Sequence, residues 1–229
     1  ILTELSIKMK TMTTAAILQP PRKASREQRK QQMIEATIES LAARGYAQTT
    51  MTDVAAASGV SHGLVNFHFE TKEKLLTETL LYLAAEYREN WRHALAGAAP
   101  SPAAQLNALL LADFNEKICT QSKLRAWCAF WGEAQSRPIY QEKCDANDQA
   151  CNRELEEVCA RLIAEGGYSH NAARVARLLR VVVEGLWFDI MSMTTPYSRD
   201  EAMRTVYACA SALFPRHFGE SGLLEQPTL

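Results

Sequence analysis

The sequence contains no long hydrophobic run. A transmembrane helix needs about 18 or more consecutive apolar residues, and no segment of the chain approaches that length. The first 21 residues hold only the four-residue apolar run AAIL, which is too short for the core of a signal peptide. We therefore expect a cytoplasmic protein that makes no contact with a membrane.

Motifs of the common enzyme classes are also missing. The chain has no GxSxG, no HExxH, no glycine-rich phosphate loop and no Cys–His pair at a recognisable spacing. The six cysteines include no CxxC pair, although Cys144, Cys151 and Cys159 are spaced to share one helix face. We expect no enzyme, no cofactor and no metal site. The cysteines are predicted to be small buried residues in a reducing cytoplasm, with a redox or metal role as the alternative.

Glycine and proline are scarce, with 10 and 8 residues in a chain of 229, and no segment alternates polar and apolar residues with period two. This pattern argues against a β-rich fold and for helix after helix, so the expected fold class is all-α. The predicted helices cover about 25–45, 52–58, 61–70, 71–97, 102–118, 122–136, 138–165, 170–193 and 198–214.

The chain has little net charge, −1 in total, so its overall field selects no class of partner. The charge is unevenly distributed, however. Residues 22–30 carry five positive side chains and one negative one, whereas residues 75–229 carry 15 Lys and Arg against 19 Asp and Glu. A small basic end on an acidic body indicates that this end faces a polyanion.

The segment GVSHGLVNFHFETKEKL, residues 59–75, completes a predicted helix-turn-helix. A short helix ends at Ser58, Gly59 supplies the positive φ of the turn, and Val60 packs between the two helices. Ser61 caps the following helix and leaves its first amides free for a phosphate. In such a motif the second helix enters the major groove of DNA.

The string TTMTDVAAASGVSHGLVNFHFETKEKL, residues 49–75, resembles the TetR family of bacterial repressors. The matching positions are Thr50, Val54, Ala55, Gly59, Val60, Ser61, Gly63, Phe69, Lys72 and Leu75. The chain departs from the family pattern at Asn66 and His68, where tyrosine is usual, and Asn66 reaches less far toward a phosphate. The resemblance implies an N-terminal three-helix helix-turn-helix domain at 25–70, followed by a larger helical ligand-binding and dimerisation domain at 71–218. Flexible tails are expected at 1–24 and 219–229.

The same resemblance implies which residues contact DNA. His62 is predicted to contact a base edge, and Lys72 a backbone phosphate. A metal site at His62 and His68 is excluded because residues six apart do not share one face of a short helix. Basic residues 22–26 would either reach the adjacent groove as an arm or form a solvated tail. The predicted DNA-binding residues are Thr50, Thr52, Ser61, His62, Gly63, Leu64, Asn66, Phe67, His68 and Lys72.

Two strings in the second half, LRAWCAFWGEA at 124–134 and VVVEGLWFDIM at 181–191, resemble the choline-responsive subgroup of this family, which controls glycine-betaine synthesis genes. Trp127 and Trp131 are four residues apart and share a helix face. A quaternary ammonium group is held by aromatic faces and nearby carboxylates. Alternatively, these aromatics form plain core or bind a lipophilic drug or metabolite. The predicted ligand-binding residues are Trp91, Phe114, Trp127, Phe130, Trp131, Glu184, Trp187 and Phe188.

The helix at 170–193 is apolar on most of its surface after Val181, so it must be buried in the body or in a dimer. A homodimer would place two recognition helices about 34–36 Å apart on a palindromic operator in double-stranded DNA. We expect a repressor that leaves its operator when a small effector, choline or a related quaternary ammonium compound, changes this spacing. An unregulated architectural DNA-binding protein would not need the large second half. The predicted interface residues on the last helix are Met203, Val206, Tyr207, Ala210 and Leu213.

Overall fold

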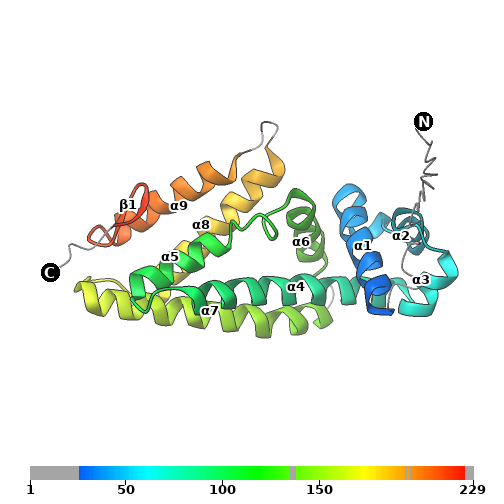
Figure 1. The fold of residues 1–229 in the computed structure, drawn as a ribbon, viewed down its shortest axis with the longest axis horizontal. Helices are drawn as coiled ribbons and strands as arrows, with labels where there is room; N and C mark the ends of the chain where they lie inside the picture. Colours follow the sequence, from blue (N-terminus) through cyan, green and yellow to red (C-terminus); the bar gives the residue numbers. More distant parts are fainter. Residues whose placement is uncertain (1–25, 135–137, 194, 196, 225–229) are drawn as a thin grey trace, which may run out of the picture.

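The computed structural model describes residues 26–134, 138–193, 195 and 197–224, and these are helical almost throughout (Figure 1). No helix within these ranges is long and apolar enough to cross a membrane. The expected all-α fold is confirmed. In chain order the elements are α1 (Arg26–Gln48), α2 (Met51–Ser58), α3 (His62–Phe69), α4 (Lys72–Gly97), α5 (Pro102–Ala112), α6 (Gln121–Ala134), α7 (Pro138–Gly166), α8 (Ala172–Ser192), α9 (Arg199–Leu213), β1 (Phe218–Gly219) and β2 (Gly222–Leu223).

Short polar residues cap the starts of most helices. Thr50 and Asp53 form a capping box at α2, in which each side chain accepts the other residue's backbone N–H. Ser61 Oγ accepts the backbone N–H of Leu64 at 3.2 Å and so begins α3. Gly59 ends α2 in the left-handed region, with φ 66°, and turns the chain directly toward α3. The other side-chain caps are Thr71, Ser101, Thr120, Asn171 and Ser198.

Two separate hydrophobic cores organise the molecule. The first, which we call the DNA-domain core, joins α1, α2, α3, the first half of α4 and part of α6. The second, the body core, joins the end of α4 with α5, α7, α8, α9 and β1. Figure 1 shows α1, α2 and α3 gathered at one end, while α4 runs from them along the body beside α7. The long helix α4 therefore belongs to both cores.

Two predicted element boundaries are corrected. Helix α5 ends at Ala112 rather than near 118, because turns follow it; Asn115 Oδ1 accepts the backbone N–H of Lys117 at 2.9 Å and fixes one of them. The segment expected to be a tail from 219 contains part of a small antiparallel hairpin, in which β1 pairs with β2. The burial of Phe218 in the body core anchors it. The tail predicted at 1–24 lies outside the described residues.

Three of the five predicted interface residues on α9 are corrected. Val206, Tyr207 and Ala210 are buried against the protein's own body core, so their side chains do not face a second subunit. Met203 and Leu213 are only partly buried, and their place in an interface stays a prediction. Large apolar side chains of α8, in contrast, remain exposed. Leu178, Val181 and Phe188 are all among the exposed large hydrophobic side chains.

Candidate functional site

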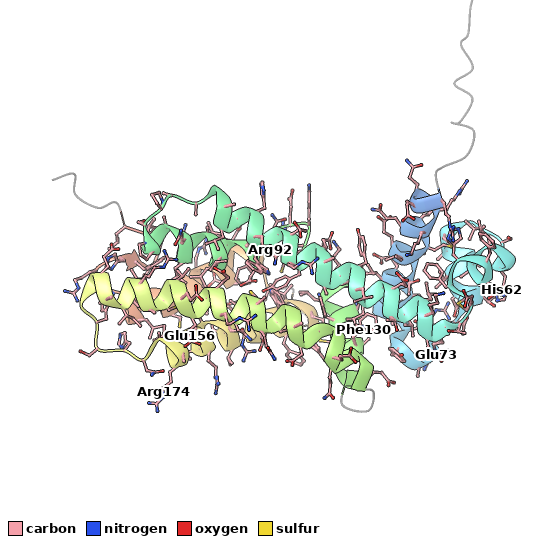
Figure 2. The ribbon with its side chains drawn as sticks, turned by 90° about the horizontal axis from the view of Figure 1, so that it is seen from below. His62, Glu73, Arg92, Phe130, Glu156 and Arg174 are labelled. Carbon is pink, nitrogen blue, oxygen red and sulfur yellow. The ribbon has the colours of Figure 1, made fainter. Side chains whose placement is uncertain are left out.

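The exposed face of α3 lies at the end of the molecule, where Figure 2 shows His62. Val65 and Phe69 point into the DNA-domain core and are fully buried. Because these two residues fix the inner face of α3, the opposite face is open to solvent. The predicted DNA-binding residues that are exposed are Thr50, Thr52, Ser61, His62, Gly63, Asn66 and Phe67.

Side chains on the open face of α3 are already ordered against neighbours. Asn66 Nδ2 donates a hydrogen bond to His62 Nδ1 at 3.2 Å, which leaves His62 Nε2 as the outward nitrogen. Phe67 is 67% exposed, and the Arg26 guanidinium lies 5.7 Å from its ring centroid. A large apolar ring held outward beside a cation is suited to contact with a base edge and the adjoining phosphates.

The remaining predicted DNA-binding residues are less accessible. Leu64 and His68 are half-buried, and burial lowers the pKa of His68, with the positive charges of Arg26 and Lys30 adding to that effect. Lys72 is also half-buried, and its Nζ donates to the carbonyl oxygen of Ala47 at 2.8 Å. A DNA contact by Lys72 therefore requires this hydrogen bond to be shared or exchanged.

We expect Lys72→Ala to weaken binding to all DNA sequences alike, whereas His62→Ala should change the preference among them. Phosphate contacts position a protein on DNA, and base contacts specify the sequence. Loss of one phosphate contact should also reduce the slope of log K against log salt by about one. Binding to an operator library at several salt concentrations tests this, and two variants with the same profile would overturn the assigned roles.

A cavity of about 780 Å³ lies in the body beside α6. Its walls come from α4, α5, α6, α7 and α8, so residues that are far apart in the sequence meet there. A volume of this size is typical of pockets that take small organic ligands. The lining residues are Leu80, Tyr87, Leu109, Leu110, Asp113, Trp127, Phe130, Trp131, Gln141, Cys144, Asp145, Asp148, Cys151, Asn152, Leu155, Leu179, Arg180, Val183, Glu184 and Trp187.

One part of the cavity, which we call the inner end, is built around Asp113. Tyr87 Oη donates to Asp113 Oδ1 at 2.8 Å, and Trp187 Nε1 donates to the Asp113 carbonyl oxygen at 3.0 Å. The rings of Tyr87 and Trp187 meet edge to face at 5.9 Å. Burial raises the pKa of the Asp113 carboxyl to about 7; the hydrogen bond from Tyr87 opposes this, and the charge of Glu184 adds to it. This carboxyl therefore changes charge near neutral pH.

Further carboxyl groups follow along α7 and α8. Glu184 forms an ion pair with Arg180, the only cationic side chain that lines the cavity among the described residues. Loss of hydration raises the pKa of Asp148 to about 6, with the nearby charges of Glu184 and Asp145 contributing in the same direction. Four carboxyl groups thus share the cavity with a single guanidinium.

The other part of the cavity, the outer end, is formed by Trp127 and Trp131 of α6. Their rings stack at 6.5 Å with an angle of 29°, and Trp131 is 45% exposed. Gln141, Cys144 and Asp145 line the cavity from the start of α7. This end therefore combines indole faces with a carboxylate.

Five of the eight predicted ligand-binding residues line the cavity: Trp127, Phe130, Trp131, Glu184 and Trp187. The structure does not bring the other three there. Phe114 is buried in the body core, and Trp91 borders a separate hollow of about 370 Å³ between α4 and α7. Phe188 follows Trp187, so it points to a different side of α8 and is 57% exposed.

The sequence interpretation missed Tyr87, Asp113, Asp145 and Asp148. A signal was available for Asp148, which is four residues after Cys144 and three before Cys151 and so shares the helix face that the cysteine spacing indicates. Asp145 is adjacent to Cys144 and points about 100° away from that face. No comparable signal existed for Asp113, which lies in the turn after α5 and reaches the cavity only through tertiary packing.

The cysteines on α7 form part of the cavity wall and of the core beyond it. Cys144 and Cys151 line the cavity, and Cys159 is buried in the body core. All six cysteines are free thiols. Burial raises the pKa of Cys144 to about 11 and that of Cys151 to about 12, so both thiols stay protonated and unreactive at neutral pH.

Comparison with known proteins adds independent findings. The family model described as "Bacterial regulatory proteins, tetR family" matches residues 33–79, and that described as "BetI-type transcriptional repressor, C-terminal" matches residues 102–215. The HTH-type transcriptional regulator BetI of Stenotrophomonas maltophilia is 27% identical over 188 residues, which are 82% of this chain and 93% of the relative. BetI of Burkholderia thailandensis is 26% identical over 184 residues, 80% of this chain and 92% of the relative.

Solved structures show the same architecture. A proposed transcriptional regulator from Pseudomonas aeruginosa PAO1 is 27% identical with a TM-score of 0.72, over 84% of this chain and 93% of that one. Another, from Saccharomonospora viridis in complex with choline, is 17% identical with a TM-score of 0.70, over 80% of this chain and 95% of that one. At 17% identity, the likeness to the Saccharomonospora viridis protein shows a shared fold. This chain belongs to the TetR family of bacterial transcriptional regulators and carries a C-terminal domain of the BetI type.

Proposed function

We propose that this regulator is a dimeric repressor whose cavity senses a small organic cation, choline or a related quaternary ammonium compound, and that it controls glycine-betaine metabolism genes. The observation that carries the proposal is the cavity itself. It combines indole and phenol faces with four carboxyl groups, against one arginine among the described lining residues. That combination is complementary to a cation with a methylated, weakly hydrated surface.

The physical chemistry favours a cation over a neutral effector. A quaternary ammonium group has no N–H to donate, so it is held by the negative faces of aromatic rings and by nearby carboxylates. A neutral lipophilic ligand would displace water from Asp113, Asp145 and Asp148 without supplying a compensating charge, which costs free energy. The choline complex of a protein with the same fold supports the same ligand class.

The proposed dimer uses the exposed face of α8. Leu178, Val181 and Phe188 are separated by three and seven residues, so they form one apolar stripe along the helix. The same stripe on a second copy of the chain would be self-complementary across a twofold axis. Such a dimer presents two α3 helices, as a palindromic operator requires.

Helix α6 connects the cavity to the DNA-binding end. Phe130 lines the cavity, yet it is buried in the DNA-domain core at the junction that Figure 2 shows. Its ring meets Tyr46 edge to face at 6.1 Å, and the Lys72 ammonium lies 5.7 Å from the Tyr46 ring centroid. A ligand that displaces α6 therefore disturbs the end of α1 and Lys72. Effector and operator would then favour different positions of these helices.

The experiment that tests the proposal measures thermal shift and operator binding with the same set of compounds. Choline, betaine aldehyde, glycine betaine, a lipophilic cation and a neutral lipophile are each added to the protein, with and without its upstream DNA. We expect choline or a close relative to raise the melting temperature and to release the DNA. If only the neutral lipophile stabilises the protein and releases the DNA, the effector is a lipophilic drug or metabolite and not an organic cation.

We expect Trp187→Phe to lower choline affinity by about fivefold, because a tryptophan face binds a cation more strongly than a phenylalanine face and a desolvated cation–π contact contributes roughly 1–2 kcal/mol. Trp187 is 8% exposed and donates to the Asp113 carbonyl oxygen, so melting curves accompany the titrations to show that the variant is folded. Trp131→Phe, at the other end of the cavity, is the control and should keep the wild-type choline affinity. Calorimetric titration tests this. Equal affinity in all three proteins would show that choline does not contact Trp187.

We expect Tyr46→Leu to retain choline binding but to reduce the effect of choline on operator affinity. The change removes the ring that lies between Phe130 and Lys72, whereas Tyr46→Phe preserves it. Allosteric coupling energies are typically about 1–3 kcal/mol, so a loss is measurable as a smaller fold-change in operator affinity. Titrations of operator with and without choline test this. A Tyr46→Leu variant with full choline response would rule out this connection.

A further inference from the structure

The two ends of the cavity belong to different cores. At the inner end, Tyr87, Trp187 and Cys151 pack with the body core. At the outer end, Trp127 and Cys144 pack against the DNA-domain core. The cavity therefore lies across the boundary between the effector-binding body and the DNA-binding helices.

Helix α7 shows how far apart the two ends of the cavity are. Cys144 marks the outer end, and Cys151 marks the inner end because its Sγ lies 4.0 Å from Tyr87 Oη. Seven residues of α-helix rise by about 10 Å. One choline molecule is too small to contact aromatic faces at both ends at once, and the volume of about 780 Å³ also exceeds what it would fill.

The carboxyl groups are spread along the same direction. Asp113 lies at the inner end with Tyr87, Asp145 lies at the outer end with Cys144, and Asp148 lies between them on α7. Glu184 is paired with Arg180. A ligand with one positive charge would compensate the carboxyl group at one end of the cavity, and the carboxyl group at the other end would receive no counter-charge from it.

We propose that the cavity accepts an elongated organic dication, with one cationic group against Tyr87, Trp187 and Asp113 and the other against Trp127, Trp131 and Asp145. This inference rests on the proposed effector role of the cavity and narrows its ligand class. A molecule that contacts both ends holds the two cores at a fixed separation. It therefore acts on the position of α6 and α1 more directly than a ligand confined to one end.

The probe for this inference is hexamethonium, which carries two trimethylammonium groups on a six-carbon chain. Its affinity is measured by calorimetry beside those of choline and tetramethylammonium, which carry one such charge each. We expect hexamethonium to bind at least about tenfold more tightly than either, a difference of about 1.4 kcal/mol. The same compounds are added to the protein–operator complex, where hexamethonium should release DNA at the lowest concentration.

Two variants test where the second cationic group of the ligand binds. Asp145→Asn should remove most of the advantage of hexamethonium while leaving choline affinity nearly unchanged. Glu142→Gln is the matched control, because Glu142 is an exposed carboxylate on the same helix that does not line the cavity. The control should keep the wild-type ratio between the two ligands.

The outcomes separate this inference from the proposed function. If choline binds and releases DNA but hexamethonium binds no more tightly, the two-ended site is wrong and the cation sensor stands. Equal loss of the hexamethonium advantage in both variants would also overturn the assigned positions. If none of the three cations binds or affects operator binding, the cation-sensing function fails together with this inference.

Discussion

Phe188→Asp is expected to convert the protein to a monomer and to abolish operator binding at concentrations where the wild type binds fully. Phe188 is 57% exposed and lies on the stripe with Leu178 and Val181 on α8. In a twofold dimer the substitution would place two carboxylates at the interface and remove two aromatic rings. Loss of a central aromatic contact costs roughly 2 kcal/mol or more per subunit, so dimerisation should weaken about a thousandfold.

The measurement combines light scattering with operator titration over a range of protein concentrations. Leu81→Asp serves as the matched control, because Leu81 is also an exposed large hydrophobic residue but lies on α4. The control should stay dimeric. A dimeric Phe188→Asp variant with normal operator affinity would show that another surface forms the interface.

Local sequence signals were sufficient for the helix-turn-helix. Gly59 adopts the left-handed conformation that the turn requires, and Ser61 caps α3 as the pattern GVS indicated. These features depend on a few neighbouring residues and on backbone sterics. Ser101 and Ser198 cap α5 and α9 in the same way, next to the predicted starts of these helices at 102 and 198.

Tertiary contacts were less accessible to the same reasoning. Helical spacing shows that Val206 and Tyr207 belong to an apolar region, but it does not show whether the chain itself or a second subunit covers them. In the structure, the protein's own body core covers both residues. Phe188 was predicted as a ligand-binding residue from the string VVVEGLWFDIM, but it lies outside the cavity because adjacent helical residues such as Trp187 and Phe188 point about 100° apart.

The residues of the candidate effector site could also be predicted only in part. The tryptophans of α6 were identified because residues four apart share a helix face. Asp113 was not identified, since its place in the cavity depends on where the turn after α5 meets Tyr87 and Trp187. A single sequence carries no pattern that joins these three positions. The acidic character of the cavity therefore became visible only in the structure.

The second large expected effect concerns this carboxyl group and its dependence on pH. Asp113 has a pKa of about 7 in the folded protein, against an ordinary value of 3.8. Between these pH values the folded state holds a proton that the unfolded state has released, so the free energy of unfolding falls as pH rises through this window. Above pH 7 the folded protein contains a buried carboxylate, which costs on the order of 4 kcal/mol.

Asp113→Asn should therefore stabilise the protein at pH 8 and have little effect near pH 4. Asparagine cannot ionise, and its Oδ1 still accepts the hydrogen bond from Tyr87. We expect the melting temperature to rise by roughly 8–16 °C at pH 8, from about 2–4 °C per kcal/mol for a chain of this size. Melting curves across this pH range test the effect, with the exposed Glu116→Gln as the control.

The same substitution should weaken the binding of a cationic effector. In the wild type the ligand favours the ionised carboxyl, so choline affinity should rise by about tenfold from pH 6 to pH 8 as Asp113 loses its proton. In Asp113→Asn most of this dependence should disappear, leaving the smaller contribution of Asp148, whose pKa is about 6. A variant that is both more stable and less responsive would show that the carboxyl is kept for binding at the expense of stability. If its affinity for choline keeps the wild-type value and pH dependence, the cation does not bind at the inner end, and the charge at Asp113 has no part in sensing it.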